Sequence, residues 1–173
     1  MKKNNFIKTE RLFITPLTAE DNRFIFELVN TEGWLTFIGN RNVATAKDAS
    51  AYVENINSNK NIKYWVVRSA AEEAIGIVTL IKRQYLQHPD IGFAFLPQFS
   101  NNGYAYEATK AVLHLIAQQK KYKQVSAITK ADNEKSIRLL RKLRFQFEKN
   151  ITDNNEELNL YSVSLQDYHE FEK

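Results

Sequence analysis

Apolar and polar residues alternate clearly near the start of the chain, in RLFITPL, residues 11–17. A period of two predicts a short strand there. The next segment, residues 18–30, opens with a helix N-cap sequence, TAED, and then carries apolar residues at helical spacing. We expect a second short helix over residues 47–55. The chain therefore begins with one strand followed by helices.

Three apolar segments separated by short polar connections make up the middle of the chain. They read KYWVVRS, AIGIVTLIK and DIGFAFL, and they cover residues 63–69, 74–82 and 90–96. Short connections join antiparallel strands, whereas parallel strands need a long crossover. This part of the sequence predicts an antiparallel meander.

The spacing of apolar residues changes from strand-like to helical at Tyr104. One helix face, ending near QQKK at residues 118–121, carries Ala105, Ala108, Val112, Leu115 and Ile116. A strand, a helix and two closing strands follow at residues 124–129, 133–143, 145–150 and 158–165. This order predicts a mixed α/β (α+β) fold in which helices flank a mostly antiparallel, twisted sheet of six to seven strands. No repeat or linker divides the sequence, so we expect one domain over residues 1–173.

Composition limits the classes of function. The chain has 173 residues, no cysteine and a net charge of +4. Disulfides, thiolate metal sites and cysteine nucleophiles are therefore excluded. The three histidines lack ligand-like spacing, and we expect no metal site. We see no signal-peptide core and no membrane-spanning apolar run, and we expect a cytoplasmic protein. The charge is a mild bias toward anionic partners and too small to indicate nucleic acid.

The stretch FLPQFSNNGYAYEATK, residues 95–110, joins a predicted strand to a predicted helix through a cluster of small polar residues. The first N–H groups of such a helix point at the junction, where they and the helix dipole favour an anion. Gly103 enters left-handed conformations freely, and Asn101 and Asn102 do so more readily than most residues. Physics alone leaves two interpretations open, a plain turn or a cradle for a phosphate.

The segment FAFLPQFSNNGYA, residues 93–105, resembles the acyl-CoA signature of the GNAT superfamily of N-acetyltransferases. The positions that carry the signature are Phe93, Phe95, Pro97, Ser100, Gly103 and Ala105. KTERLFITPL is similar to the family's opening strand, IGNRNVATAKDASAYVE to the helical segment after it, DIGFAFLP to its fourth strand, and DNEKSIRLLRKLRF to its Asn–x–x–Ser helix motif. The resemblance covers nearly the whole chain and is strongest to the branch that acetylates N-terminal amines of ribosomal proteins. It implies the GNAT fold and acetyl-CoA as co-substrate.

The resemblance also implies roles for residues that would bind the cofactor. The amides of Asn101, Asn102, Gly103, Tyr104 and Ala105 would hold the pyrophosphate, with one hydrogen bond from Ser100. The backbone of Phe95 and Leu96 would pair with the pantetheine arm like an added strand. Asn133 would meet the pantetheine, and Arg138 or Lys142 would approach the 3′-phosphate.

Structural interpretations of the same residues remain open. Phe93 and Phe95 suit a core, Asn133 suits a helix N-cap, and the basic residues suit a solvated face. Two positions depart from the family pattern. Ser100 stands where the family has Gln or Arg, and Arg144 stands where KLRF replaces the usual KLGF. Arg144 is the expected left-handed residue after the helix.

Acetyl transfer to an amine requires a neutral amine, a donor for the oxyanion and a proton for the departing thiolate. Because cysteine is absent, we expect direct attack in a ternary complex. Ser136 is the candidate acid, and its alternative is an ordinary helix residue. The family often uses a tyrosine four residues later, where this chain has Leu140. Asp90 is the candidate base, acting through water, and its alternative is a turn residue closing QHPD. His88 is a further candidate for titration near neutral pH.

The sequence thus predicts an acetyl-CoA-dependent N-acetyltransferase acting on a primary amine, with the N-terminal amine of a protein as one acceptor. The alternatives are a small amine, such as a polyamine, an amino acid or an aminoglycoside, and a non-catalytic basic nucleic-acid-binding domain. KYWVVR is the one hint of the last. Trp34, Phe37 and Arg41 either line the acceptor pocket or serve packing. We expect no membrane partner, and the sequence leaves open whether the chain acts as a homodimer.

Overall fold

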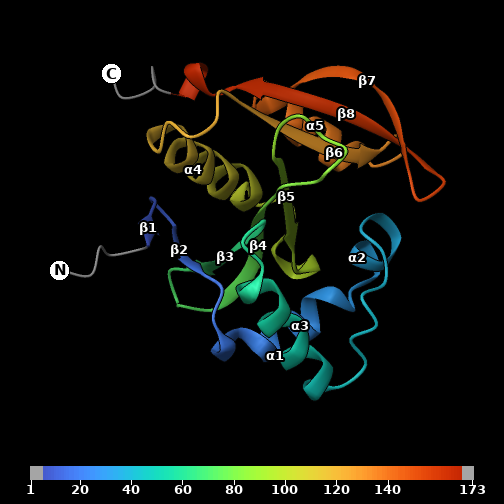
Figure 1. Cartoon of the computed structure of the whole chain (residues 1–173). Coiled ribbons are helices and arrows are strands. Elements are labelled where there is room, and N and C mark those ends of the chain that lie inside the picture. Colours follow the sequence, from blue (N-terminus) through green and yellow to red (C-terminus); the bar gives the residue numbers. More distant parts are fainter. Residues whose placement is uncertain (1–5, 169–173) are drawn as a thin grey trace.

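A computed structural model describes residues 6–168, in which the strands form one eight-stranded sheet of order β1-β2-β3-β4-β5-β6-β8-β7 (Figure 1). The strands are β1 (Ile7–Lys8), β2 (Leu12–Pro16), β3 (Ile62–Ser69), β4 (Ala74–Ile81), β5 (Asp90–Phe95), β6 (Gln124–Lys130), β7 (Gln146–Asp153) and β8 (Glu156–Ser164). Neighbouring strands are antiparallel except for β5 and β6, which run parallel. The long connection between these two strands contains a helix, as a parallel crossover requires.

Helices cover both faces of the sheet. They are α1 (Asn22–Val29), α2 (Glu32–Phe37), α3 (Ala46–Ser58), α4 (Tyr104–Gln118) and α5 (Glu134–Lys142), with short 3₁₀ turns η1 (Ala19–Asp21), η2 (Pro97–Phe99) and η3 (Leu165–Tyr168). One core lies between the sheet and α1–α3, and a second lies between the sheet and α4 and α5 (Figure 1). Successive side chains of a strand point to opposite faces of the sheet. In β3, Val66 therefore packs in the first core, and Trp65 and Val67 pack in the second. No helix in residues 6–168 is long and apolar enough to cross a membrane.

The mixed α/β class and the antiparallel meander are confirmed, with two elements added. The eighth strand, β1, is two residues long and pairs Ile7 with Ile14, so it has no periodicity that a sequence could show. Helix α2 is six residues long and is held at its start by Thr31, whose side chain accepts a hydrogen bond from the Trp34 N–H at 3.3 Å. Helix α3 extends beyond residues 47–55 at both ends: Thr45 and Asp48 form a capping box that fixes its start at Ala46, and the helix continues to Ser58.

The end of α5 confirms the expected conformation of Arg144, which has φ of 64°. The Arg144 N–H donates to the Arg141 carbonyl at 2.9 Å, and the Phe145 N–H donates to the Leu140 carbonyl at 3.0 Å. These two bonds form a Schellman motif, and Leu140 and Phe145 are both buried, as the motif favours. The β-carbon of Arg144 makes this left-handed backbone conformation energetically unfavourable.

Arg144→Gly is expected to raise the free energy of unfolding by about 0–1 kcal/mol, because glycine relieves the left-handed strain while the cation near the helix end is lost. Chemical denaturation measures the change. Arg144→Ala is the matched control, since it removes the guanidinium but keeps the strain, and it should be less stable than Arg144→Gly. A glycine variant less stable than the alanine variant would contradict the account of this helix end.

Candidate functional site

The junction between β5 and α4 has the backbone of an anion cradle. Gly103 is the N-cap of α4 with φ of 79° and ψ of 0°, and Asn101 also has a positive φ of 65°. None of the backbone N–H groups of residues 101–105 donates a hydrogen bond to another residue that the structure describes. Five N–H groups at a helix N-terminus, where the helix dipole is positive, suit a phosphate.

Arg11, which the sequence analysis did not single out, lies against this cradle. Its Nη1 donates to the Asn102 carbonyl at 3.0 Å, and its guanidinium stacks on the Tyr104 ring at 4.7 Å. A β-carbon on Gly103 would sit 3.4 Å from Arg11 Nη2. The cradle therefore has a cation beside it, although its signature position is the neutral Ser100.

Glu107 holds Arg11 in this position from the first turn of α4. Its Oε2 accepts from Arg11 Nε at 2.7 Å, and its Oε1 accepts from the Thr9 hydroxyl at 2.6 Å and from the Arg11 N–H at 3.0 Å. Burial raises the pKa of Glu107, but these hydrogen bonds outweigh it and the pKa is lowered overall. A carboxylate that stays ionised keeps the guanidinium beside the cradle. No local sequence pattern could show this contact, because 96 residues separate the partners.

β5 and β6 form a fork that opens toward the cradle. They pair at Asp90 and Ser126, where the Ser126 N–H donates to the Pro89 carbonyl at 2.9 Å. A continuing parallel ladder would next join the Ile128 N–H to β5 backbone. That N–H instead donates to Asp90 Oδ1 at 3.2 Å. The Asp90 side chain therefore ends the ladder, and beyond it β5 runs through the middle of the molecule while β6 runs with β8 (Figure 1).

The backbone of Phe93 and Phe95 faces this opening. Ala94 and Gly92 pair with β4 in register, and the Leu96 N–H donates to the Ile75 carbonyl at 2.9 Å. Hydrogen-bonded and non-hydrogen-bonded pairs alternate along antiparallel strands, so the N–H and C=O groups of Phe93 and Phe95 point away from β4. Leu96 does not match the expectation, because its N–H bonds to β4 and its carbonyl accepts from the Phe99 N–H at 3.0 Å. The backbone groups of Phe93 and Phe95, and not those of Leu96, are therefore the ones that face away from β4.

Asp90 is buried at the base of the fork, with 4% of its surface exposed, so it is no surface turn residue. Its Oδ2 accepts from Arg83 Nε at 2.8 Å. Burial raises the pKa of Asp90 to about 6, against the lowering effects of Arg83 and of the Ile128 N–H. A carboxyl group with this pKa titrates near neutral pH and can accept a proton there.

Helix α5 begins just after the open end of β6. Asn133 is its N-cap, with Oδ1 accepting from the Ser136 N–H at 3.2 Å, so the N-cap interpretation is confirmed. The half-buried Ser136 lies in the first turn. Arg138 is exposed and pairs with Glu134 at 3.3 Å.

A cavity of about 180 Å³ between α4 and the end of α5 is lined by three cationic side chains. They are Lys110, Lys142 and Arg144. Lys142 Nζ lies 4.4 Å over the Tyr106 ring, which also lines the cavity. Lys142 therefore lines a cationic cavity one to two helical turns from the cradle, whereas Arg138 points to the solvated face.

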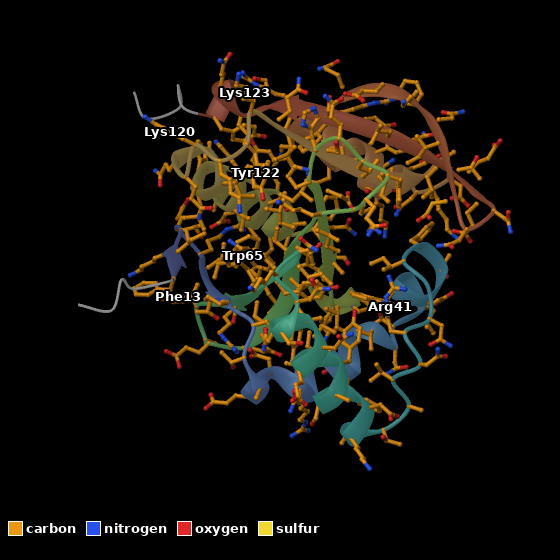
Figure 2. All side chains as sticks on the ribbon, in the orientation of Figure 1. Phe13, Arg41, Trp65, Lys120, Tyr122 and Lys123 are labelled. Atoms are coloured by element: carbon orange, nitrogen blue, oxygen red, sulfur yellow. The ribbon has the colours of Figure 1, made fainter. Side chains whose placement is uncertain are left out.

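The face of the sheet next to α2 carries polar groups beside the base of the fork. The Tyr64 hydroxyl lies 3.3 Å from that of Tyr52, and burial raises the pKa of Tyr64, while the charges of Arg41 and Arg83 lower it. Arg41 extends from the loop between α2 and α3 (Figure 2). Trp34 is a core residue with 4% exposure, and its Nε1 donates to the Gly39 carbonyl at 3.1 Å, so it packs and does not line a pocket. Among the described residues, no group of three or more His, Cys, Asp or Glu side chains could hold a metal ion.

Comparison with known proteins gives consistent results. The model of an acetyltransferase (GNAT) domain matches residues 11–146. An "uncharacterized N-acetyltransferase", YnaD of Bacillus subtilis (strain 168), is 27% identical over 137 residues, which cover 79% of this chain and 80% of that protein.

Two solved structures share the fold. A spermidine N-acetyltransferase from Vibrio cholerae, solved with CoA and spermine, has a TM-score of 0.80 at 17% identity and covers 93% of this chain and 99% of its own. RimL, a ribosomal L7/L12 alpha-N-protein acetyltransferase solved with CoA, has a TM-score of 0.80 at 15% identity and covers 92% of this chain and 97% of its own.

Proposed function

The chain belongs to the GNAT family of acetyltransferases, and on that premise we propose that it transfers the acetyl group of acetyl-CoA to a primary amine by direct attack in a ternary complex. The proposal depends on one observation: two features lie along the same strand. The cradle of five backbone N–H groups follows the end of β5, and the fork between β5 and β6 opens toward it. A nucleic-acid-binding module needs neither feature.

The residues present fit the donor. The N–H groups of residues 101–105 bind the pyrophosphate, with Arg11 supplying the charge that Ser100 lacks. Phe93 and Phe95 pair through their backbone with the pantetheine arm. β5 has six residues and spans about 20 Å, which brings the arm from the cradle to the base of the fork. Lys142 and its neighbours in the α4–α5 cavity take the 3′-phosphate.

Acetyl-CoA supplies an activated thioester at the base of the fork. The neutral amine forms a bond to the thioester carbon, and the carbon–sulfur bond breaks. Asp90, through a water molecule, accepts the proton that the amine loses. Ser136 donates a hydrogen bond or a proton to the departing sulfur. A backbone N–H of β5 that faces the fork stabilises the negative carbonyl oxygen. The proton that the amine loses goes to Asp90, and a proton that Ser136 gives to the sulfur is replaced from solvent, so the step balances without a cysteinyl intermediate.

The acceptor is an amine of a protein N-terminus or of a small molecule. Structural neighbours include one enzyme of each kind, RimL and the spermidine acetyltransferase. At 15% and 17% identity these neighbours share the fold alone, so neither decides the acceptor. The choice depends on this chain's own residues near the base of the fork.

Ser136→Ala is expected to lower kcat by about 10- to 1,000-fold, because the thiolate then leaves without its donor. Release of the CoA thiol, measured across peptides and small amines, gives the rate and at the same time tests the proposed function. The affinity for acetyl-CoA should be nearly unchanged. Ser58→Ala, at the far end of α3, is the control and should retain full turnover. Equal turnover of Ser136→Ala and wild type would remove Ser136 from the mechanism.

A further inference from the structure

A second concave surface lies at the opposite end of β5 and α4 from the cradle. Its volume is about 410 Å³, and it lies between the β4–β5 connection, residues 82–89, and the α4–β6 connection, residues 121–123. Helix α4 has 15 residues and spans about 22 Å, so this pocket is well separated from the cradle at the helix N-terminus. We call it the basic pocket.

Cationic side chains line the basic pocket: Lys82, Arg83, Lys121 and Lys123. None of the described residues that line it is acidic. Lys82 Nζ and Lys121 Nζ lie 5.7 Å and 5.4 Å from the centre of the same ring, that of Tyr122. Both ammonium groups therefore lie beside the same lining residue, and an anion bound in the pocket would be attracted by both.

The basic pocket adjoins the base of the fork. Arg83 lines the pocket and bonds through Nε to Asp90 Oδ2 at 2.8 Å. Pro89 also lines the pocket, and its carbonyl accepts from the Ser126 N–H where β5 and β6 pair. Arg83 and Pro89 therefore belong both to the lining of the basic pocket and to the base of the fork.

We propose that the basic pocket binds an anionic group of the acceptor, so that the acceptor is a primary amine that also carries a carboxylate or a phosphate. The inference rests on the proposed acetyl transfer and names its substrate class. Lysine and arginine side chains attract such a group and repel a polyamine, whose remaining ammonium groups would lie beside them.

An anionic amine can come from two sources, a peptide whose first residues are acidic or a small molecule. The test measures thiol release with pairs matched in size. One pair is a peptide with acidic residues after its N-terminus and the same peptide with lysines there. The other pair is phosphoethanolamine and ethanolamine, with spermidine as the polycation. We expect the anionic member of at least one pair to have a kcat/KM about tenfold higher or more. Preference for spermidine or for the basic peptide, or equal rates within both pairs, would overturn the inference.

Reversing charges in the basic pocket tests this inference independently of the proposed function. The double variant Lys82→Glu and Lys123→Glu should raise KM for the anionic acceptor about tenfold, with KM for acetyl-CoA unchanged. The control, Arg23→Glu and Lys47→Glu, makes the same change of charge on the exposed surface of α1 and α3 and should leave both values unchanged.

A second double variant, Lys82→Gln and Lys123→Gln, keeps the test valid if the first variant does not fold. It should raise KM for the anionic acceptor by a smaller factor. An unchanged KM for the anionic acceptor in both folded variants would contradict the inference while leaving acetyl transfer intact. Failure of the proposed function itself would show as no turnover with any amine.

Discussion

Gly103→Val is expected to abolish the rise in melting temperature that acetyl-CoA produces in the wild-type protein. At a concentration about 100 times Kd, a ligand specific to the folded state stabilises it by about 2.7 kcal/mol. Valine at φ of 79° is strained, and its side chain would occupy the space between the cradle backbone and the Arg11 guanidinium, where we place the pyrophosphate. The fold should survive with a loss of about 1–2 kcal/mol, because the only described atom within 4 Å of the new β-carbon belongs to the flexible Arg11 side chain.

Gly39→Val is the matched control for backbone strain. Gly39 has a positive φ of 101° and lies in the loop after α2, away from the cradle. This variant should lose a similar amount of stability and keep the full shift with acetyl-CoA. If Gly103→Val also kept the shift, residues 101–105 would not be the pyrophosphate site.

Asp90→Asn is expected to lower kcat by about 10- to 1,000-fold and to change the pH profile. Burial raises the pKa of Asp90 to about 6, so wild-type activity should rise as pH increases through about 6, where the carboxylate forms. The amide cannot accept a proton, and this limb of the profile should disappear in the variant. A profile of thiol release against pH measures both effects.

Asp21→Asn controls for the loss of a buried acid. Asp21 is also 4% exposed and pairs with an arginine, Arg68, but lies in η1 and not in the fork. It should reduce stability without altering kcat or the pH profile. A lower kcat in Asp90→Asn with the limb near pH 6 retained would mean that Asp90 only holds the fork open.

The raised pKa of Asp90 also sets the sign of its effect on folding. The folded state holds the proton more tightly than the unfolded chain does, since its pKa is about 6 and the ordinary value is 3.8. The contribution of Asp90 to stability is therefore fully present below about pH 3.8 and is lost as pH rises through 6. A buried acid kept at this position costs stability at neutral pH, which is consistent with a role in function.

Local patterns were enough to predict the features that depend on adjacent residues. The period of two predicts β2, apolar segments with short polar connections predict β3–β5, and the period of 3.6 predicts α4. Arg144, where KLRF replaces the family's KLGF, is the expected left-handed residue, and it has a positive φ. The resemblance to the GNAT signature located the cradle. In each case the determining residues lie within a few positions of one another, so the sequence alone contains the information.

Features made by distant residues were missed. Arg11 reaches the cradle through Glu107 from the other end of the chain, and Asp90 ends the β5–β6 ladder by bonding to Ile128. The sequence places Leu96 in the strand expected to pair with the pantetheine, but it does not show which residues of that strand direct their backbone N–H and C=O groups toward β4. Alternation depends on register with β4, and register is set by the packed sheet.

The account depends most directly on acetyl-CoA binding, and calorimetric titration of the purified protein with acetyl-CoA tests it. We expect saturable binding at one site per chain in the wild-type protein, retained in Gly39→Val and lost in Gly103→Val. No heat of binding, together with no change in melting temperature at millimolar acetyl-CoA, would contradict the proposed acetyl transfer and every role assigned to the cradle and the fork.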